Sequence, residues 1–145
     1  MLYTDDYFMK EALKEAQKAF DRDEVPVGCV VVASDRIIAR GHNLTETLND
    51  VTAHAEMQAI TASAHYLGGK FLTDCSVYIT LEPCPMCAGA LFWARPGRIV
   101  YGAEDPKNGY MKHRPSLIHP KTLITKGVLA EESAALLRSF FEKKR

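Results

Sequence analysis

Residues 75–94, CSVYITLEPCPMCAGALFWA, place a strand and a helix in immediate succession. Cys75 to Leu81 are rich in β-branched and aromatic side chains, which favour extended chain, and they predict a strand. Cys84 to Ala94 predict a helix that ends before Pro96 and Gly97. Strands that alternate with helices in this way are typical of an α/β protein.

The segments on both sides continue this alternation. Before it we expect a helix that Thr4 caps and Pro26 ends, strands at 27–33 and 36–40, and a helix at 53–67. After it we expect strands at 98–103 and 123–126 and a helix at 131–144. This order predicts a three-layer αβα sandwich, in which helices cover both faces of a mixed sheet of about five strands. With 145 residues, the chain is expected to form a single domain, residues 1–145.

Composition argues against several classes of protein. Hydrophobic residues make up 47% of the chain and charged residues 25%, which is close to the globular average and disfavours a disordered or fibrous chain. The longest apolar run, Val27 to Ala33, is far shorter than the ~18 residues of a membrane span, and Met1 to Asp6 lack the basic start of a signal peptide. Four cysteines are too few for a disulfide scaffold. We therefore expect a cytoplasmic protein without membrane association.

The net charge of zero conceals a division along the chain. Residues 1–94 carry 7 basic and 13 acidic side chains, a net charge of −6, whereas residues 95–145 carry 11 and 5, a net charge of +6. Two differently solvated faces account for such a division. A nucleic-acid surface in the second half is the alternative.

Two cysteines have the spacing of a metal site. Cys84 and Cys87 lie three positions apart at the start of a predicted helix, so their side chains share one face. Pro83 and Pro85 suit the first helical turn, and the positive end of the helix dipole favours the thiolate over the thiol. His54 begins another predicted helix. Two thiolates and one imidazole suit zinc and leave the fourth tetrahedral position open, as in catalytic sites, so we expect one zinc ion per chain.

Glu56 follows His54 by two positions, about 200° around a helix, so it is not expected to bind the same ion. A carboxylate beside a zinc-activated water can take a proton from it and return that proton to a nitrogen, which predicts a hydrolytic enzyme. The competing hypothesis is a structural zinc clip in a binding module. Its fourth ligand would be Cys29 or Cys75, but both lie in predicted buried strands and are expected to be core residues.

His54-Ala55-Glu56 together with Pro83-Cys84-Pro85-Met86-Cys87 resembles the motif of the zinc-dependent cytidine and deoxycytidylate deaminase superfamily. The resemblance covers nearly the whole chain and is greatest to the bacterial tRNA adenosine deaminase branch. Further stretches that resemble this branch are VPVG at 25–28, GHN at 41–43, TAHAE at 52–56, MCAGA at 86–90, YGA at 101–103 and the tail from 127 to 145.

The resemblance implies hydrolytic deamination of a nucleobase with release of ammonia, most closely of adenosine to inosine at the anticodon wobble position of tRNA. It also implies a homodimer. It assigns zinc binding to His54, Cys84 and Cys87, and proton transfer to Glu56. It further assigns substrate binding to Asn43, to the backbone of Ala55 and to Val27.

Two departures from the tRNA branch keep other substrates open. Tyr110 to Arg114 are bulkier than the small residues usual there, and Phe92 to Pro96 also resemble guanine deaminases. Guanine, a free nucleoside or cytosine is therefore an alternative substrate. Trp93 is expected to pack within the protein rather than to stack on a base. If the substrate is tRNA, the candidate contact residues are Asp105, Lys107, Lys112, Arg114, Lys143, Lys144 and Arg145.

Overall fold

The structure is a computed structural model that describes residues 3–144. Five strands form one sheet in the order β2-β1-β3-β4-β5. The strands are β1 (Gly28–Ala33), β2 (Arg36–His42), β3 (Cys75–Leu81), β4 (Arg98–Ala103) and β5 (Leu123–Lys126). The helices are α1 (Asp5–Asp21), α2 (Ala55–Leu67), α3 (Pro85–Ala94), the short α4 (Tyr110–His113) and α5 (Ala130–Lys143), with a 3-10 turn, η1, at Pro115–Leu117.

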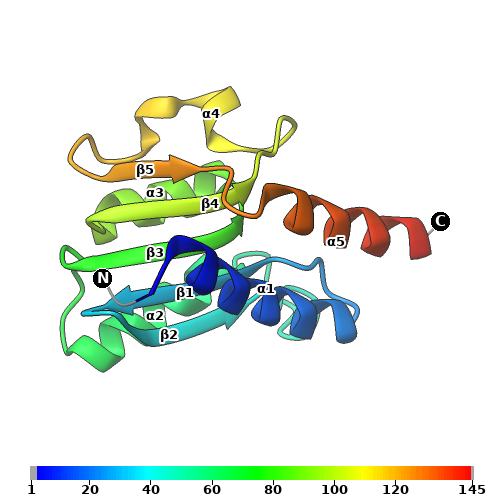
Figure 1. Ribbon diagram of the computed structural model, residues 1–145, viewed down its shortest axis with the longest axis horizontal. Coiled ribbons are helices and arrows are strands. Elements are labelled where there is room, and N and C mark those ends of the chain that lie inside the picture. The colour runs from blue at the N-terminus through cyan, green and yellow to red at the C-terminus, as the bar shows by residue number, and fades with distance from the viewer. Residues whose placement is uncertain (1–2, 145) are drawn as a thin grey trace.

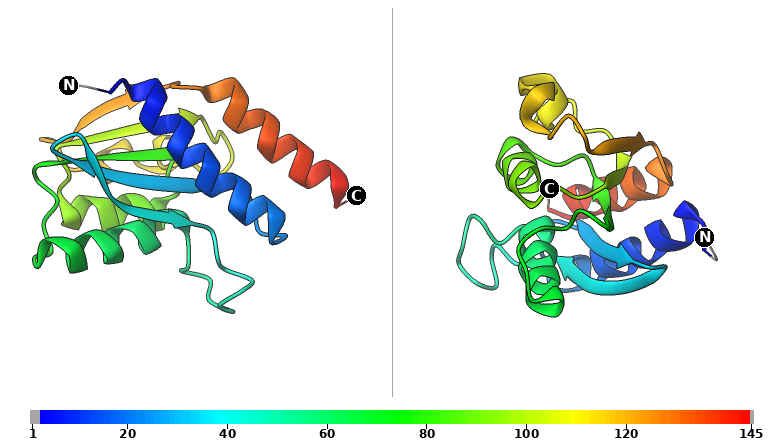
Figure 2. Two further views of the ribbon diagram at one scale, coloured as in Figure 1. Left: turned by 60° about the horizontal axis from the view of Figure 1, so that its bottom comes forward. Right: turned by 90° about the vertical axis from the view of Figure 1, so that its left-hand side faces the viewer.

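The elements form three layers, as the sequence predicted (Figure 1). The helices α1 and α5 run side by side over one face of the sheet, and α2 and α3 cover the other face (Figure 2). Buried side chains lie on both faces: Val30, Tyr78 and Val100 face α1, whereas Val31 and Ile79 belong to the cluster under α2 and α3. The prediction of a mixed sheet between two helical layers is therefore confirmed.

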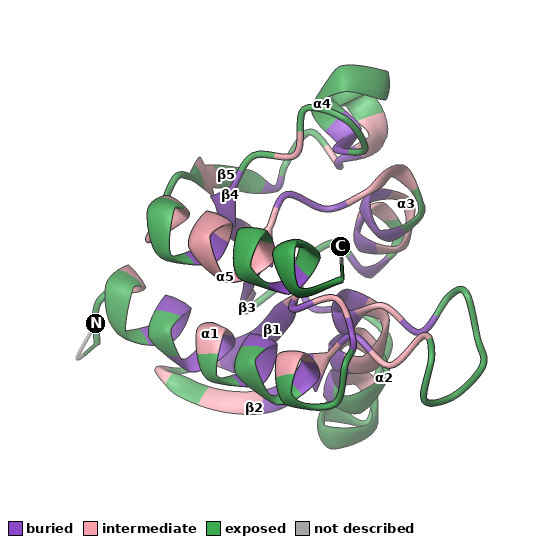
Figure 3. Ribbon diagram, turned by 90° about the vertical axis from the view of Figure 1, so that its right-hand side faces the viewer, coloured by how far each residue is buried: buried purple, intermediate pink, exposed green. Residues whose placement is uncertain are grey.

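The strand directions bring several chain segments to one edge of the sheet. The strands β3, β4 and β5 are parallel, so their carboxyl ends lie at the same edge. The strand β1 is antiparallel to both β2 and β3, so the start of β1 and the end of β2 lie at that edge too. Figure 3 looks onto this edge, where the exposed loop between β2 and α2 projects from the body.

Gly28, at the start of β1, allows α1 to approach the sheet closely. A Cβ atom at this position would lie 2.0 Å from the carbonyl oxygen of Ala12 in α1. The backbone amide of Gly28 also donates a hydrogen bond to Oγ1 of Thr80 in β3. The glycine therefore permits α1 to pack closely against the sheet, next to the edge where β3 ends.

Three local predictions are wrong. Pro26 does not end the first helix: α1 ends at Asp21, and Asp23 then adopts a left-handed conformation with φ of 64°. The sequence predicts no helix or strand between residues 103 and 123, but this region contains α4 and η1, which are too short to produce a periodic sequence pattern.

None of the helices within residues 3–144 combines the length and the apolar character that a membrane span requires.

The third error concerns Trp93, which is 70% exposed rather than packed within the protein. The helix α3 is apolar on all sides, but only one side meets the sheet, through residues such as Leu91. Trp93 lies on the outer side with Met86, seven positions earlier, which is also exposed. Periodicity could not distinguish these two sides because both carry apolar residues.

Candidate zinc centre and substrate pocket

Three side chains at the starts of α2 and α3 lie close together at the edge of the sheet where β3 ends. His54 is the N-cap of α2, Cys84 is the N-cap of α3, and Cys87 lies in the first turn of α3. The Nδ1 atom of His54 lies 3.6 Å from Sγ of Cys84 and 3.5 Å from Sγ of Cys87. The three ligand atoms all lie within 4.8 Å of one another.

This geometry fits zinc. Bond lengths of about 2.3 Å to sulfur and about 2.1 Å to nitrogen, at tetrahedral angles, separate a nitrogen and a sulfur ligand by about 3.6 Å. The distances from His54 to Cys84 and Cys87 agree with that value. Among the described residues no fourth histidine, cysteine or acidic side chain joins the group. The site therefore has the three-ligand pattern of a catalytic centre rather than the closed pattern of a structural clip.

The electrostatics of the site favour a thiolate. A hydrogen bond from Cys87 lowers the pKa of the Cys84 thiol to about 4, with a further contribution from His54, although burial acts in the opposite direction. The hydrogen bond to Cys84 raises the pKa of His54. The pKa of Cys87 is raised by its hydrogen bond to Cys84 and by burial. The site thus holds one thiolate readily and must release a proton from Cys87 on binding a metal ion.

Glu56 lies in the first turn of α2 and is only 4% exposed. Burial raises its pKa to about 7, and the charge of Cys84 adds to this effect, whereas the charge of His54 opposes it. Glu56 does not belong to the ligand group, as its position in the helix predicted. A carboxyl group with a pKa near neutrality can both accept and donate a proton.

A cavity of about 470 Å³ opens beside these residues. Its walls include the three residues to which the family resemblance assigned base binding, namely Val27, Asn43 and Ala55, and one of the predicted nucleic-acid contacts, Asp105. The remaining wall residues are Val25, Thr45, His54, Glu56, Leu81, Glu82, Cys84, Pro85, Asn108 and His113.

Asn43 is held within this wall by its neighbours. Its Oδ1 accepts a hydrogen bond from the amide of Thr45 at 3.2 Å, and its Nδ2 donates to the carbonyl oxygen of Val25 at 3.4 Å. The adjoining loop is anchored by Glu24, a fully buried carboxylate that accepts hydrogen bonds from Thr45, Glu46 and Thr47. Sequence reasoning missed Glu24 and Glu82, because the loop amides that each carboxylate binds lie more than twenty positions away.

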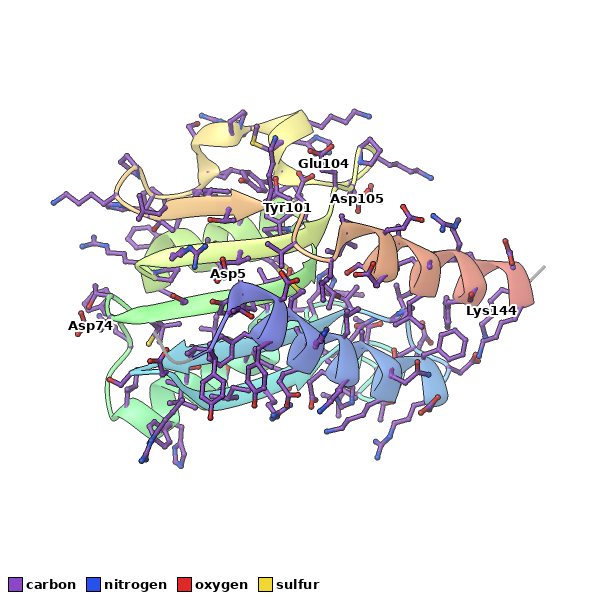
Figure 4. The ribbon with its side chains drawn as sticks, viewed as in Figure 1. Asp5, Asp74, Tyr101, Glu104, Asp105 and Lys144 are labelled. Atoms are coloured by element: carbon purple, nitrogen blue, oxygen red, sulfur yellow. The ribbon has the colours of Figure 1, made fainter. Side chains whose placement is uncertain are left out.

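The basic candidates fall into two groups. Lys107, Lys112 and Arg114 are exposed in the segment after β4, next to the pocket residues Asp105 and His113. Lys143 and Lys144 lie at the far end of α5, where both form salt bridges with Asp23. Figure 4 shows Lys144 at that end of the helix. Arg145 lies outside the described residues. Cys29 and Cys75 are buried in β1 and β3, as predicted.

The chain belongs to the cytidine and deoxycytidylate deaminase zinc-binding family, whose model matches residues 2–103. It is accordingly a zinc-dependent deaminase with its zinc site at His54, Cys84 and Cys87. It is 46% identical to a tRNA-specific adenosine deaminase of Agrobacterium fabrum, over 96% of this chain and 95% of that protein.

Two solved structures extend the comparison. A structure from a study of A-to-I editing by tRNA:A34 deaminases at the wobble position is 44% identical, with a TM-score of 0.84, and covers 90% of this chain and 99% of that one. A guanine deaminase from Bacillus subtilis is 42% identical, with a TM-score of 0.67, over 70% of this chain and 66% of that one.

Proposed function

We propose that this chain converts adenosine to inosine at the wobble position of a tRNA anticodon. The observation that carries the proposal is the 46% identity to a tRNA-specific adenosine deaminase along nearly the full length of both chains, combined with the zinc site and its adjoining pocket. The guanine deaminase likeness covers a smaller part of this chain. A base in an RNA loop is unpaired, so it enters a pocket at little energetic cost.

Glu56 performs the proton transfers in this proposal. When bound, zinc supplies Lewis-acid activation of a water molecule. Glu56 takes a proton from this water and delivers it to N1 of adenine as the water oxygen bonds to C6. Glu56 then takes the remaining proton from the added oxygen and transfers it to the amino group. The bond from C6 to that nitrogen breaks, and ammonia leaves. The products are inosine and ammonia, so the step consumes one water molecule.

The remaining pocket residues hold the base. The side-chain amide of Asn43 and the backbone of Ala55 supply hydrogen-bonding groups, and Val27 supplies an apolar contact. Because Thr45 and Val25 already fix the orientation of the Asn43 side chain, little conformational freedom is lost when the base binds. Burial of Ala55 and Glu56 limits the access of bulk water to the reacting atoms.

We also propose that Asp105, Lys107, Lys112 and Arg114 contact the RNA around the pocket mouth. The three basic side chains are exposed and follow the strand whose carboxyl end borders the pocket. Lys143, Lys144 and Arg145 at the end of α5 are a second contact region in this proposal. Because Asp23 pairs with Lys143 and Lys144, their contribution per residue is expected to be smaller.

A homodimer is the final part of the proposal. The outer face of α3 carries exposed Met86 and Trp93, and a helix that is apolar on all sides is normally covered on all sides. We propose that a second copy of this chain covers that face. The dimer would remove Trp93 from water; Trp93 lies in the last turn of α3, whereas Cys84 and Cys87 lie at the start of that helix.

The experiment that identifies the substrate uses one enzyme preparation and measures both the released ammonia and the deaminated base. Zinc-loaded protein is incubated with a tRNA anticodon stem-loop and, separately, with guanine, adenosine and cytosine, and released ammonia is measured in each case. Inosine formation in the stem-loop, with at least a hundredfold lower rate on free bases, supports the proposal. Rapid conversion of guanine to xanthine without inosine formation would establish guanine deamination in its place.

A further inference from the structure

Glu82 precedes the helix α3, and its side chain contacts the segment that follows β4. It is only 5% exposed. Its Oε1 accepts a hydrogen bond from the amide of Asp105 at 3.0 Å, and its Oε2 accepts one from the amide of Met111 at 3.0 Å. Within residues 3–144 it forms no salt bridge. Both carboxylate oxygens accept hydrogen bonds from backbone amides of a single segment, residues 105–111.

Two backbone hydrogen bonds join the same parts of the chain. The amide of Glu82 donates to the carbonyl oxygen of Ala103 at 2.8 Å, and the amide of Tyr110 donates to the carbonyl oxygen of Pro83 at 3.0 Å. Cys84, a zinc ligand, follows directly. The connection between β3 and α3 is therefore bonded both to the end of β4 and to residues 105–111.

Gly109 completes this contact. A Cβ atom at position 109 would lie 2.0 Å from Oε2 of Glu82. The φ angle of Gly109 is −71°, which any residue adopts, so this position requires the absence of a side chain rather than glycine's conformational freedom. The absence of a side chain at Gly109 thus leaves room for the Glu82 carboxylate.

The segment held by Glu82 forms part of the substrate pocket. Asp105 and Asn108 belong to it, and His113 follows it in α4; all three line the cavity beside the zinc site. Figure 4 shows Asp105 beyond the end of β4, between that strand and α4. The zinc ligands, in contrast, lie outside this segment, at the starts of α2 and α3.

We propose that Glu82 is a positioning residue that holds residues 105–111 in the conformation that receives the substrate. A carboxylate suits this task because it accepts two charge-assisted hydrogen bonds from separate amides. Without it the segment must be ordered during binding, and that loss of entropy weakens affinity. The inference rests on the proposed function for its kinetic test, and it predicts an effect on KM rather than on the chemical step.

The test uses two variants that disturb the contact from opposite sides. Glu82→Gln replaces one acceptor oxygen by an NH2 group that faces a backbone donor. Gly109→Ala keeps the carboxylate but crowds it, and the new Cβ atom would also lie 2.6 Å from the carbonyl oxygen of Asp105. We expect each to raise KM for the anticodon stem-loop by roughly tenfold or more, because preorganisation is lost, with kcat within about threefold of wild type. Zinc content should remain at one per chain.

Matched controls are available in the same chain. Glu15 is a buried carboxylate on α1 that pairs with Arg40 and His42, so Glu15→Gln should reduce stability without raising KM. Gly69 has open space around it, so Gly69→Ala should change neither quantity. An unchanged KM in both test variants, or a loss of zinc that parallels the loss of activity, would overturn the proposal.

Amide hydrogen exchange separates this inference from the proposed function. If wild-type protein does not deaminate the stem-loop, the proposed function fails, and exchange at the amides of Asp105 and Met111 still tests Glu82. Faster exchange at these two amides in Glu82→Gln and Gly109→Ala, with unchanged exchange in α2, supports the positioning role. Exchange equal to that of wild type would overturn it.

Discussion

Nδ1 of His54 lies 3.6 Å from Sγ of Cys84, although thirty positions separate the two residues in the chain. Each is the N-cap of its helix, and both helices begin at the edge of the sheet where β3 ends. The parallel pairing of β3 and β4 and the antiparallel position of β1 create that edge. The zinc site is thus a product of sheet topology as well as of motif spacing.

Removal of one thiolate ligand should abolish metal binding. Cys87→Ala leaves two protein ligands, and we expect its zinc content to fall from one per chain to near zero, with loss of deaminase activity. Metal analysis of purified protein checks this. Chelation of wild-type protein should have the same effect on activity and zinc should restore it, whereas full zinc occupancy in Cys87→Ala would refute the ligand assignment.

Glu56→Gln should separate metal binding from catalysis. The amide keeps the size and polarity of the side chain but cannot carry a proton, so we expect turnover to fall by ~10²–10⁴-fold or more with zinc content unchanged. Single-turnover kinetics and metal analysis on the same sample measure both. A Glu56→Gln protein that loses its zinc would identify Glu56 as a ligand instead.

Glu24 should contribute to stability in a pH-dependent way. Burial raises its pKa, but hydrogen bonds from Thr47, Glu46 and Thr45 outweigh burial and leave the pKa below the ordinary value of 4.5. Because the folded-state pKa is depressed, the stabilisation is fully present above the unfolded-state pKa and is lost as pH falls through the lower, folded-state value.

Glu24→Gln should therefore lower the free energy of unfolding by about 2–3 kcal/mol at pH 7, since charge-assisted hydrogen bonds to a buried group are lost. The difference from wild type should shrink as the pH is lowered below 4.5. Urea denaturation at a series of pH values measures it. A difference that is constant across this range would show that the charge of Glu24 plays no part.

The exposed lysines after β4 should control the salt dependence of RNA binding. In the double variant Lys107→Ala, Lys112→Ala, we expect weaker stem-loop binding and a salt slope reduced by about 2, because each phosphate contact releases about one counterion. Lys70→Ala, beyond the end of α2, serves as the control and should bind normally. An unaltered slope in the double variant would remove these residues from the interface.

Trp93→Asp should convert a dimer into a monomer. The substitution places a charge on the outer face of α3, where burial against a second copy would leave the carboxylate without a partner. Analytical ultracentrifugation should show twice the chain mass for wild type and one chain mass for the variant. Lys10→Ala, at an exposed position of α1 on the opposite face of the sheet, should leave the wild-type mass unchanged; a monomeric wild-type protein would contradict the homodimer.

Local sequence patterns determined most of the elements and all of the zinc ligands. The bounds of β3, β4 and β5 agree with the predicted strands at 75–81, 98–103 and 123–126. Strand formation, helix caps and the three-residue spacing of Cys84 and Cys87 depend on neighbouring residues, so they can be recognised in the sequence alone. The position of Glu56 two residues after His54 likewise predicted that it would not join the ligand group.

Only the tertiary structure decided which buried carboxylates hold the segments around the pocket. The partners of Glu24 lie in the loop after β2, and those of Glu82 lie after β4, more than twenty positions away in each case. A buried carboxylate has no sequence pattern that identifies its distant amide donors. The exposure of Trp93 was also undetermined, because α3 is apolar on every side and only the position of the sheet shows which side is covered. These features depend on contacts between distant segments, which the strand order β2-β1-β3-β4-β5 brings together.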